Sequence, residues 1–102
     1  MVAQNYKYKN YASVLWVFSS FMDYAEKSGL RLDDENLRYI ADCLLQYPTD
    51  ERKKIAKLYV VEYLTSFDNQ DGPSFARHGL ARRLANTWLR ENKHAFYENS
   101  AK

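Results

Sequence analysis

The sequence predicts an all-α fold, a compact bundle of about four mostly antiparallel helices. Only three glycines and two prolines occur among the 102 residues, so the chain has few breaks and should consist of a few long elements. Apolar residues recur at intervals of three and four along most of the chain, which is the period of an amphipathic α-helix. The composition, 46% hydrophobic and 27% charged, is typical of a globular domain. Together these observations predict helices at about 10–28, 34–47, 50–67 and 74–97.

A single domain should span residues 10–97, because a chain of this length can bury one core without disulfides or metals. Residues 1–9, in which tyrosines and lysines alternate at the end, are expected to form a flexible N-terminal arm. Alternating aromatic and basic side chains also suit base stacking, which is the alternative for this arm. Residues 98–102 should form a short C-terminal tail. The first two turns between helices are short, which favours antiparallel neighbours.

The first predicted helix, 10–28, has an unusually wide apolar surface. Its apolar residues are Tyr11, Val14, Leu15, Trp16, Val17, Phe18, Phe21, Met22 and Ala25. Such width indicates contact with more than one neighbouring helix, or a dimer surface. The apolar run is shorter than the roughly 20 residues that span a bilayer, and Ser19, Ser20 and Asp23 interrupt or close it. We therefore expect neither export nor membrane insertion.

The helix 34–47 has clear signals at both ends. Asp33 or Asp34 can accept hydrogen bonds from its first backbone N–H groups, and Pro48 disfavours helical geometry at the residue before it. Its inner face should consist of Leu37, Ile40, Ala41 and Leu44. The single cysteine, Cys43, lies beside that face; it excludes an internal disulfide and fits a reducing, cytoplasmic compartment.

The helix 50–67 is predicted to be the central element of the bundle. Thr49 is its expected N-cap. Its first turns are basic, but residues 58–64 are apolar on most sides, as expected for a helix surrounded by others. Val60 and Val61 are typical of strands, so a short strand is the local alternative.

The helix 74–97 follows the strongest break in the chain, DNQDGPS at 68–74. Ser74 is its expected N-cap, and Gly79 is expected to permit close approach of a neighbouring element. One stripe of this helix should face the core, formed by Leu80, Ala81, Leu84, Ala85, Trp88 and Ala95.

The same helix carries the candidate binding residues. All the excess positive charge lies in residues 68–102, which hold six basic and four acidic residues. The candidate contacts to a partner or to nucleic acid are Arg77, Arg82, Arg83, Asn86, Arg90 and Lys93. Arginine binds carboxylates and phosphates through paired hydrogen bonds. The chain also contains nine Tyr, five Phe and two Trp, and tyrosine, tryptophan and arginine are enriched in protein interfaces.

These features favour a small non-enzymatic interaction, adaptor or regulatory protein that contacts a protein partner or a second copy of itself. The alternative is nucleic-acid binding, with the arginines on phosphates and Asn86 on a base edge. The segment 68–74 fits a helix–turn–helix poorly, because it is long for that turn and its aspartates repel phosphate. A third interpretation is that these charges only solvate one helix face.

No motif points to catalysis, a cofactor or a metal. His78 and His94 lie 16 residues apart on one predicted helix, a rise of about 24 Å, so they cannot share a metal ion within one chain. Cys43 is best explained as a small packed side chain. The sequence contains no phosphate-binding loop. We therefore expect no catalytic residue, no cofactor and no small-molecule substrate.

Overall fold

A computed structural model describes residues 12–101, and the side chains of residues 13–91. These residues form four α-helices, two 3-10 helices and no strand. In chain order the elements are η1 (Ala12–Phe18), α2 (Ser20–Lys27), α3 (Asp34–Leu44), η2 (Thr49–Glu51), α4 (Arg52–Asp68) and α5 (Ser74–Ala101). The all-α bundle is thus confirmed, and the short strand considered at Val60 and Val61 is wrong. The predicted arm, 1–9, lies outside the described residues.

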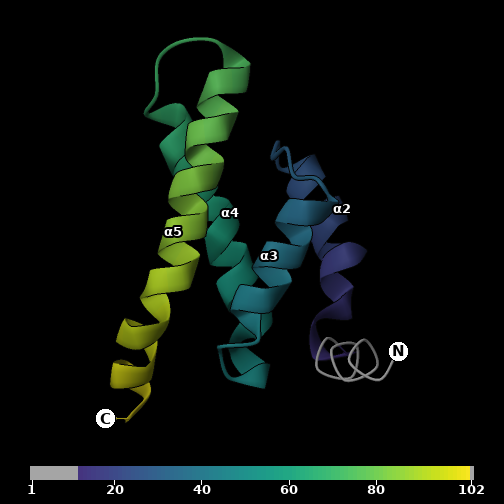
Figure 1. Cartoon of the computed structure of the whole chain (residues 1–102), viewed down its shortest axis with the longest axis vertical. Coiled ribbons are helices and arrows are strands. Elements are labelled where there is room, and N and C mark those ends of the chain that lie inside the picture. The colour runs from purple at the N-terminus through teal and green to yellow at the C-terminus, as the bar shows by residue number, and fades with distance from the viewer. Residues whose placement is uncertain (1–11, 102) are drawn as a thin grey trace.

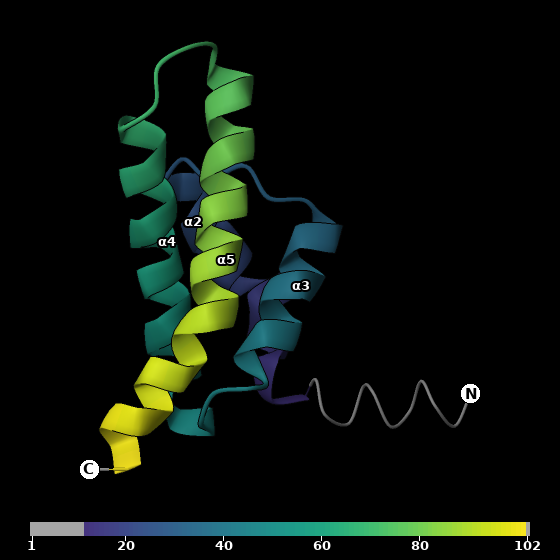
Figure 2. The same cartoon turned by 60° about the vertical axis from the view of Figure 1, so that its left-hand side comes forward.

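The helices α4 and α5 form the main axis of the molecule. They run antiparallel and side by side, joined by the loop at 69–73 (Figure 1). The helix α3 packs against both of them, and η1 and α2 complete the bundle on the side away from α5 (Figure 2). One face of α4 is buried, and its fully or almost fully buried apolar residues are Ile55, Ala56, Tyr59, Val60 and Tyr63. Leu58 and Val61 are 39% and 55% exposed, so other helices do not surround α4 on most sides as the apolar run 58–64 predicted.

The predicted continuous helix at 10–28 is wrong in its first half, which is a 3-10 helix. The break falls at Ser19, whose backbone N–H and hydroxyl both donate to the Trp16 carbonyl, at 3.2 and 3.4 Å. A serine hydroxyl that bonds a nearby carbonyl in this way competes with regular α-helical pairing. Side chains three apart eclipse in a 3-10 helix, so Val14 and Val17 both point into the core with no exposure.

The helix α3 begins as predicted and ends earlier than predicted. Asp33 is the N-cap, since its Oδ1 accepts from the Asn36 N–H at 2.8 Å. The helix stops at Leu44 rather than at 47. Tyr47 instead turns into the core, where its hydroxyl donates to the Leu89 carbonyl of α5 at 2.8 Å. This bond holds Tyr47 in place beyond the end of α3.

A buried arginine holds the turn between α3 and α4 together. Arg52 is only 9% exposed, and its Nε and Nη2 donate to the carbonyls of Tyr47 and Leu45 at 3.1 and 3.4 Å. Its Nη1 donates to the hydroxyl of Ser13 in η1. The accepting carbonyls follow the C-terminal end of α3, where the helix dipole favours positive charge. The predicted N-cap at Thr49 is wrong, because Thr49 begins η2 and Glu51 precedes α4.

The helix α5 differs from its prediction at both ends and in its buried face. Pro73 accepts the first helical hydrogen bond, from the Arg77 N–H at 3.1 Å, so Ser74 is the first helical residue and not the cap. The helix continues beyond the predicted end at 97, to Ala101. In its core stripe Leu84 is 43% exposed, whereas Leu89 is fully buried. Among the described residues, no helix is both long and apolar enough to cross a membrane.

Candidate functional site

A groove with a volume of about 340 Å³ opens between α3 and α5. We call it the arginine groove; it is lined by Tyr39 of α3 and by Gly79, Arg82, Arg83, Asn86, Thr87 and Arg90 of α5. The residues from α5 recur at three- and four-residue intervals, which places them on one side of the helix over three turns. No acidic side chain of the described residues lines the groove. It is therefore a shallow, open depression with a positive charge.

Four of the six residues predicted from the sequence meet in this groove. Arg82, Arg83, Asn86 and Arg90 all line it. Arg77 does not: its Nε and Nη2 both donate to the Phe67 carbonyl, at 3.2 and 3.1 Å.

The guanidinium of Arg77 also lies over the Phe67 ring, 4.0 Å from its centroid. Arg77 therefore bonds the C-terminal end of α4 and lies outside the groove. That Arg77 contacts a partner stays a prediction, but Arg77 does not line the groove with the other candidates. Lys93, the sixth candidate, has a side chain outside the described ones.

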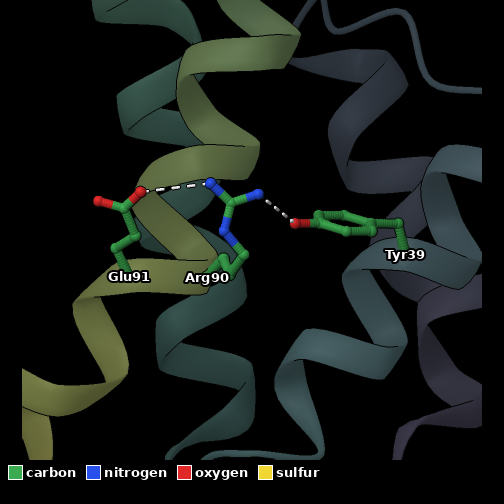
Figure 3. Close-up of polar contacts among 3 residues, drawn as sticks. All are labelled: Tyr39, Arg90 and Glu91. Atoms are coloured by element: carbon green, nitrogen blue, oxygen red, sulfur yellow. Dashed lines mark hydrogen bonds and ion pairs between the residues drawn. The ribbon is translucent and has the colours of Figure 1, made fainter.

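Arg82 and Arg90 each donate a hydrogen bond to a residue outside α5. Arg82 donates through Nη1 to the Arg31 carbonyl at 2.9 Å. Arg90 donates through Nη1 to the Tyr39 hydroxyl at 3.4 Å and pairs through Nη2 with Glu91 at 3.2 Å (Figure 3). A guanidinium has five N–H donors, so both side chains keep donors for a ligand.

The Tyr39 hydroxyl stays protonated next to Arg90. Burial and the neighbouring Cys43 raise the pKa of Tyr39, while Arg90 acts in the opposite direction. The hydrogen bond to Tyr39, followed by the one to Glu91, raises the pKa of Arg90. The groove therefore presents a neutral phenol beside a permanent cation, and the phenol oxygen accepts a hydrogen bond from Arg90.

Arg83 and Asn86 differ in what they can offer. Arg83 is exposed and makes no hydrogen bond or ion pair with the described part of the chain. Asn86 accepts through Oδ1 from the hydroxyl of Tyr59 at 2.7 Å. Burial raises the pKa of Tyr59, so this hydroxyl remains a donor. Asn86 thus offers its amide N–H groups to the groove, while one of the two lone pairs of its oxygen is already used.

Sequence reasoning missed the residues that close the groove. Tyr39 lies on α3, and no local pattern links it to an arginine of α5. Thr87 and Gly79 gave no binding signal either. Gly79 was expected to allow close approach, but no atom lies within 4 Å of where its Cβ would be. That expectation is wrong, and the missing side chain instead leaves space in the groove.

The groups that could support catalysis or metal binding lie elsewhere. Among the described residues, no cluster of three or more His, Cys, Asp or Glu side chains is placed to hold a metal ion. His78 is buried against Tyr63, whose hydroxyl lies 2.6 Å from its Nδ1. Cys43 is partly buried and packs against the core. The arginine groove is therefore the site with the clearest chemical character.

Comparison of the chain with protein-family models, with curated proteins and with solved structures gave no match. The fold and the groove define an all-α helical bundle with a basic concave surface.

Proposed function

We propose that this protein is a non-enzymatic, cytoplasmic interaction module that binds an acidic segment of a partner protein in the arginine groove. One observation carries the proposal: three guanidinium groups line a single groove of about 340 Å³ that no acidic side chain of the described residues lines. Such a surface attracts carboxylates and raises the rate at which an acidic partner docks.

The state of the three arginines supports a ligand with several carboxylates. Arg83 has no partner within the described part of the chain, and Arg90 is exposed, with long hydrogen bonds to Tyr39 and Glu91. A ligand carboxylate can replace the Arg90 contacts at low cost, because exposed ion pairs contribute little. Planar guanidinium groups bind carboxylates in pairs of hydrogen bonds, which sets orientation as well as affinity.

Nucleic acid is the alternative ligand, and the position of Asn86 does not favour it. A specific contact to adenine uses both the oxygen and the nitrogen of an asparagine amide. Here the oxygen of Asn86 already accepts from Tyr59. The groove is also short, whereas a phosphate backbone is usually met by basic residues along an extended track.

The test compares a labelled glutamate-rich peptide with single- and double-stranded DNA and RNA, each at two salt concentrations. The double variant Arg83→Ala, Arg90→Ala removes the two most exposed groove cations; loss of two charge-assisted contacts should weaken peptide binding at least about tenfold. The matched control, Lys27→Ala with Lys54→Ala, removes two exposed charges outside the groove. It should change binding by no more than about twofold.

Two results would overturn the proposal. One is peptide binding that the groove variant leaves unchanged while helical content is preserved. The other is tight, steeply salt-dependent nucleic-acid binding that the same variant abolishes, which would assign the groove to phosphates. Light scattering of the free protein and of the groove variant, at several concentrations, shows whether the chain self-associates and whether that association needs the two arginines.

A further inference from the structure

A second, smaller pocket of about 200 Å³ lies between the N-terminal elements and α4. We call it the tryptophan pocket; it is lined by Trp16 of η1, by Ser20, Phe21 and Tyr24 of α2, and by Lys53 and Lys57 of α4. It shares no residue and no helix with the arginine groove. A function assigned to one of the two sites therefore does not depend on the other.

The apolar wall of the tryptophan pocket is held in place by contacts within the protein. The indole N–H of Trp16 donates to the Ser13 carbonyl at 3.2 Å. The Trp16 ring meets Phe21 edge to face, with centroids 6.1 Å apart and planes at 86°. Phe21 is only 3% exposed, whereas Tyr24 is 43% exposed. A buried ring thus backs the pocket, and an accessible ring contributes to its opening.

Two lysines supply the charge of this pocket. Lys53 and Lys57 are one turn apart on α4, so they lie on the same side of the helix. The ammonium of Lys53 lies 5.6 Å from the centroid of the Trp16 ring. Neither lysine forms an ion pair with the described part of the chain, and no acidic side chain of the described residues lines the pocket. An apolar cavity is therefore combined with two cations that have no carboxylate partner there.

We infer that the tryptophan pocket is a docking site for one aromatic side chain of a partner protein, flanked in the partner by carboxylates. Its size supports a single ring: an apolar cavity of about 150 Å³ accommodates benzene, and this pocket measures about 200 Å³. The charge complementarity of Lys53 and Lys57 requires acidic neighbours on that partner segment. Aromatic anchors buried in pockets are the usual centres of protein interfaces.

The same geometry speaks against a stacked nucleobase. Base stacking needs an open aromatic face. Lys53 lies over the Trp16 ring and Phe21 packs against it edge to face. A side chain that enters the pocket and makes van der Waals contact with several rings uses this arrangement better than a base that must stack on one of them.

The test uses the full chain and a short acidic peptide with one central phenylalanine. The matched peptide has alanine in that position and the same charge. We expect the phenylalanine peptide to bind at least about tenfold more tightly, because burying the ring contributes most of the affinity. In NMR spectra, the phenylalanine peptide should shift the indole N–H signal of Trp16. Because the chain has two tryptophans, a Trp88→Phe variant identifies the Trp16 signal as the one that remains.

Charge reversal at Lys57 provides a variant that should fold, because Lys57 is exposed. Lys57→Glu should weaken binding of the phenylalanine peptide about tenfold or more, because the attraction between Lys57 and a peptide carboxylate becomes a repulsion. Lys54→Glu is the matched control on the same helix, because Lys54 is also exposed and does not line the pocket. It should have a clearly smaller effect.

Three outcomes would overturn the inference. The first is equal binding of the phenylalanine and alanine peptides. The second is binding that is insensitive to Lys57→Glu but lost in the Arg83→Ala, Arg90→Ala variant, which would place the peptide in the arginine groove. The third is that oligothymidylate binds more tightly than the peptide and that this binding is lost in Lys57→Glu. That result would make the pocket a nucleic-acid site.

Discussion

The hydroxyl of Tyr63 lies 2.6 Å from Nδ1 of His78, within the contact between α4 and α5. The backbone N–H of Arg31 donates to the same hydroxyl at 3.3 Å. The phenol can donate to Nδ1 of His78 only when that nitrogen carries no proton. The pKa of His78 is lowered, first by burial and then by Arg31, Arg82 and Arg77.

This contact predicts a loss of stability in acid. The unfolded chain protonates His78 near its ordinary pKa of about 6.5, whereas the folded chain does so at a lower pH. The unfolded state therefore binds more protons as pH falls below that value, and stability declines by up to about 1.4 kcal/mol per pH unit until the folded-state pKa is reached. Above about pH 7 this histidine should contribute no pH dependence.

Urea unfolding between neutral and mildly acidic pH measures that effect. His78→Gln should be less stable at neutral pH but should flatten this part of the profile, because the titrating group is gone. A His78 ring that titrates by NMR at or above the ordinary histidine range would contradict the prediction.

Replacing Arg52 should destabilise the fold far more than replacing a lysine of α4. Arg52→Met leaves the carbonyls of Leu45 and Tyr47 buried without their donor, and we expect a loss of about 2–4 kcal/mol in the free energy of unfolding. Arg52→Lys should recover only part of it, because an ammonium cannot reproduce the planar fork. Lys54→Met, on the exposed side of α4, is the control and should change stability by about 0.5 kcal/mol or less. Equal losses at the two positions would show that the Arg52 contacts do not stabilise the protein.

The bond between Tyr59 and Asn86 should matter for stability as well as for the groove. Asn86→Ala leaves the buried hydroxyl of Tyr59 without its acceptor, at a cost of about 1–3 kcal/mol. In the Asn86→Ala background, Tyr59→Phe should lower the free energy of unfolding much less than it does in the unchanged protein. The reason is that the hydroxyl has already lost its acceptor. A double-mutant cycle on chemical denaturation curves measures this coupling. Strictly additive losses would mean that the two side chains do not interact.

The glycines of the loop and of α5 should respond in opposite directions to alanine. Gly79 is helical with open space at its Cβ position, so Gly79→Ala should stabilise the protein by roughly 0.5–1 kcal/mol. Gly72 has a φ of +109°, which residues with a Cβ adopt only under strain, and Gly72→Ala should destabilise by about 1 kcal/mol or more. Thermal unfolding of the two variants tests both signs. Stabilisation by Gly72→Ala would contradict the loop geometry.

Local signals were sufficient for the helical class, for the cap at Asp33 and for most of the buried face of each helix. Helix periodicity and capping depend on residues within one or two turns, so they can be recognised without knowing what lies across the bundle. The same local reasoning failed at Ser19 and at the end of α3. At the first position the Ser19 hydroxyl bonds the Trp16 carbonyl, and after α3 the Tyr47 hydroxyl bonds the distant Leu89 carbonyl.

Which basic residues line the arginine groove was decided only by the tertiary structure. Arg52, Arg77 and Arg83 look equivalent in the sequence, yet the first two are committed to backbone carbonyls and Arg83 is not. The accepting carbonyls belong to turns and helix ends that only folding brings close. Likewise Tyr39 lines the arginine groove because α3 packs beside α5. Periodicity along the chain reports which face of a helix is buried, but it does not report which other segment lies against that face.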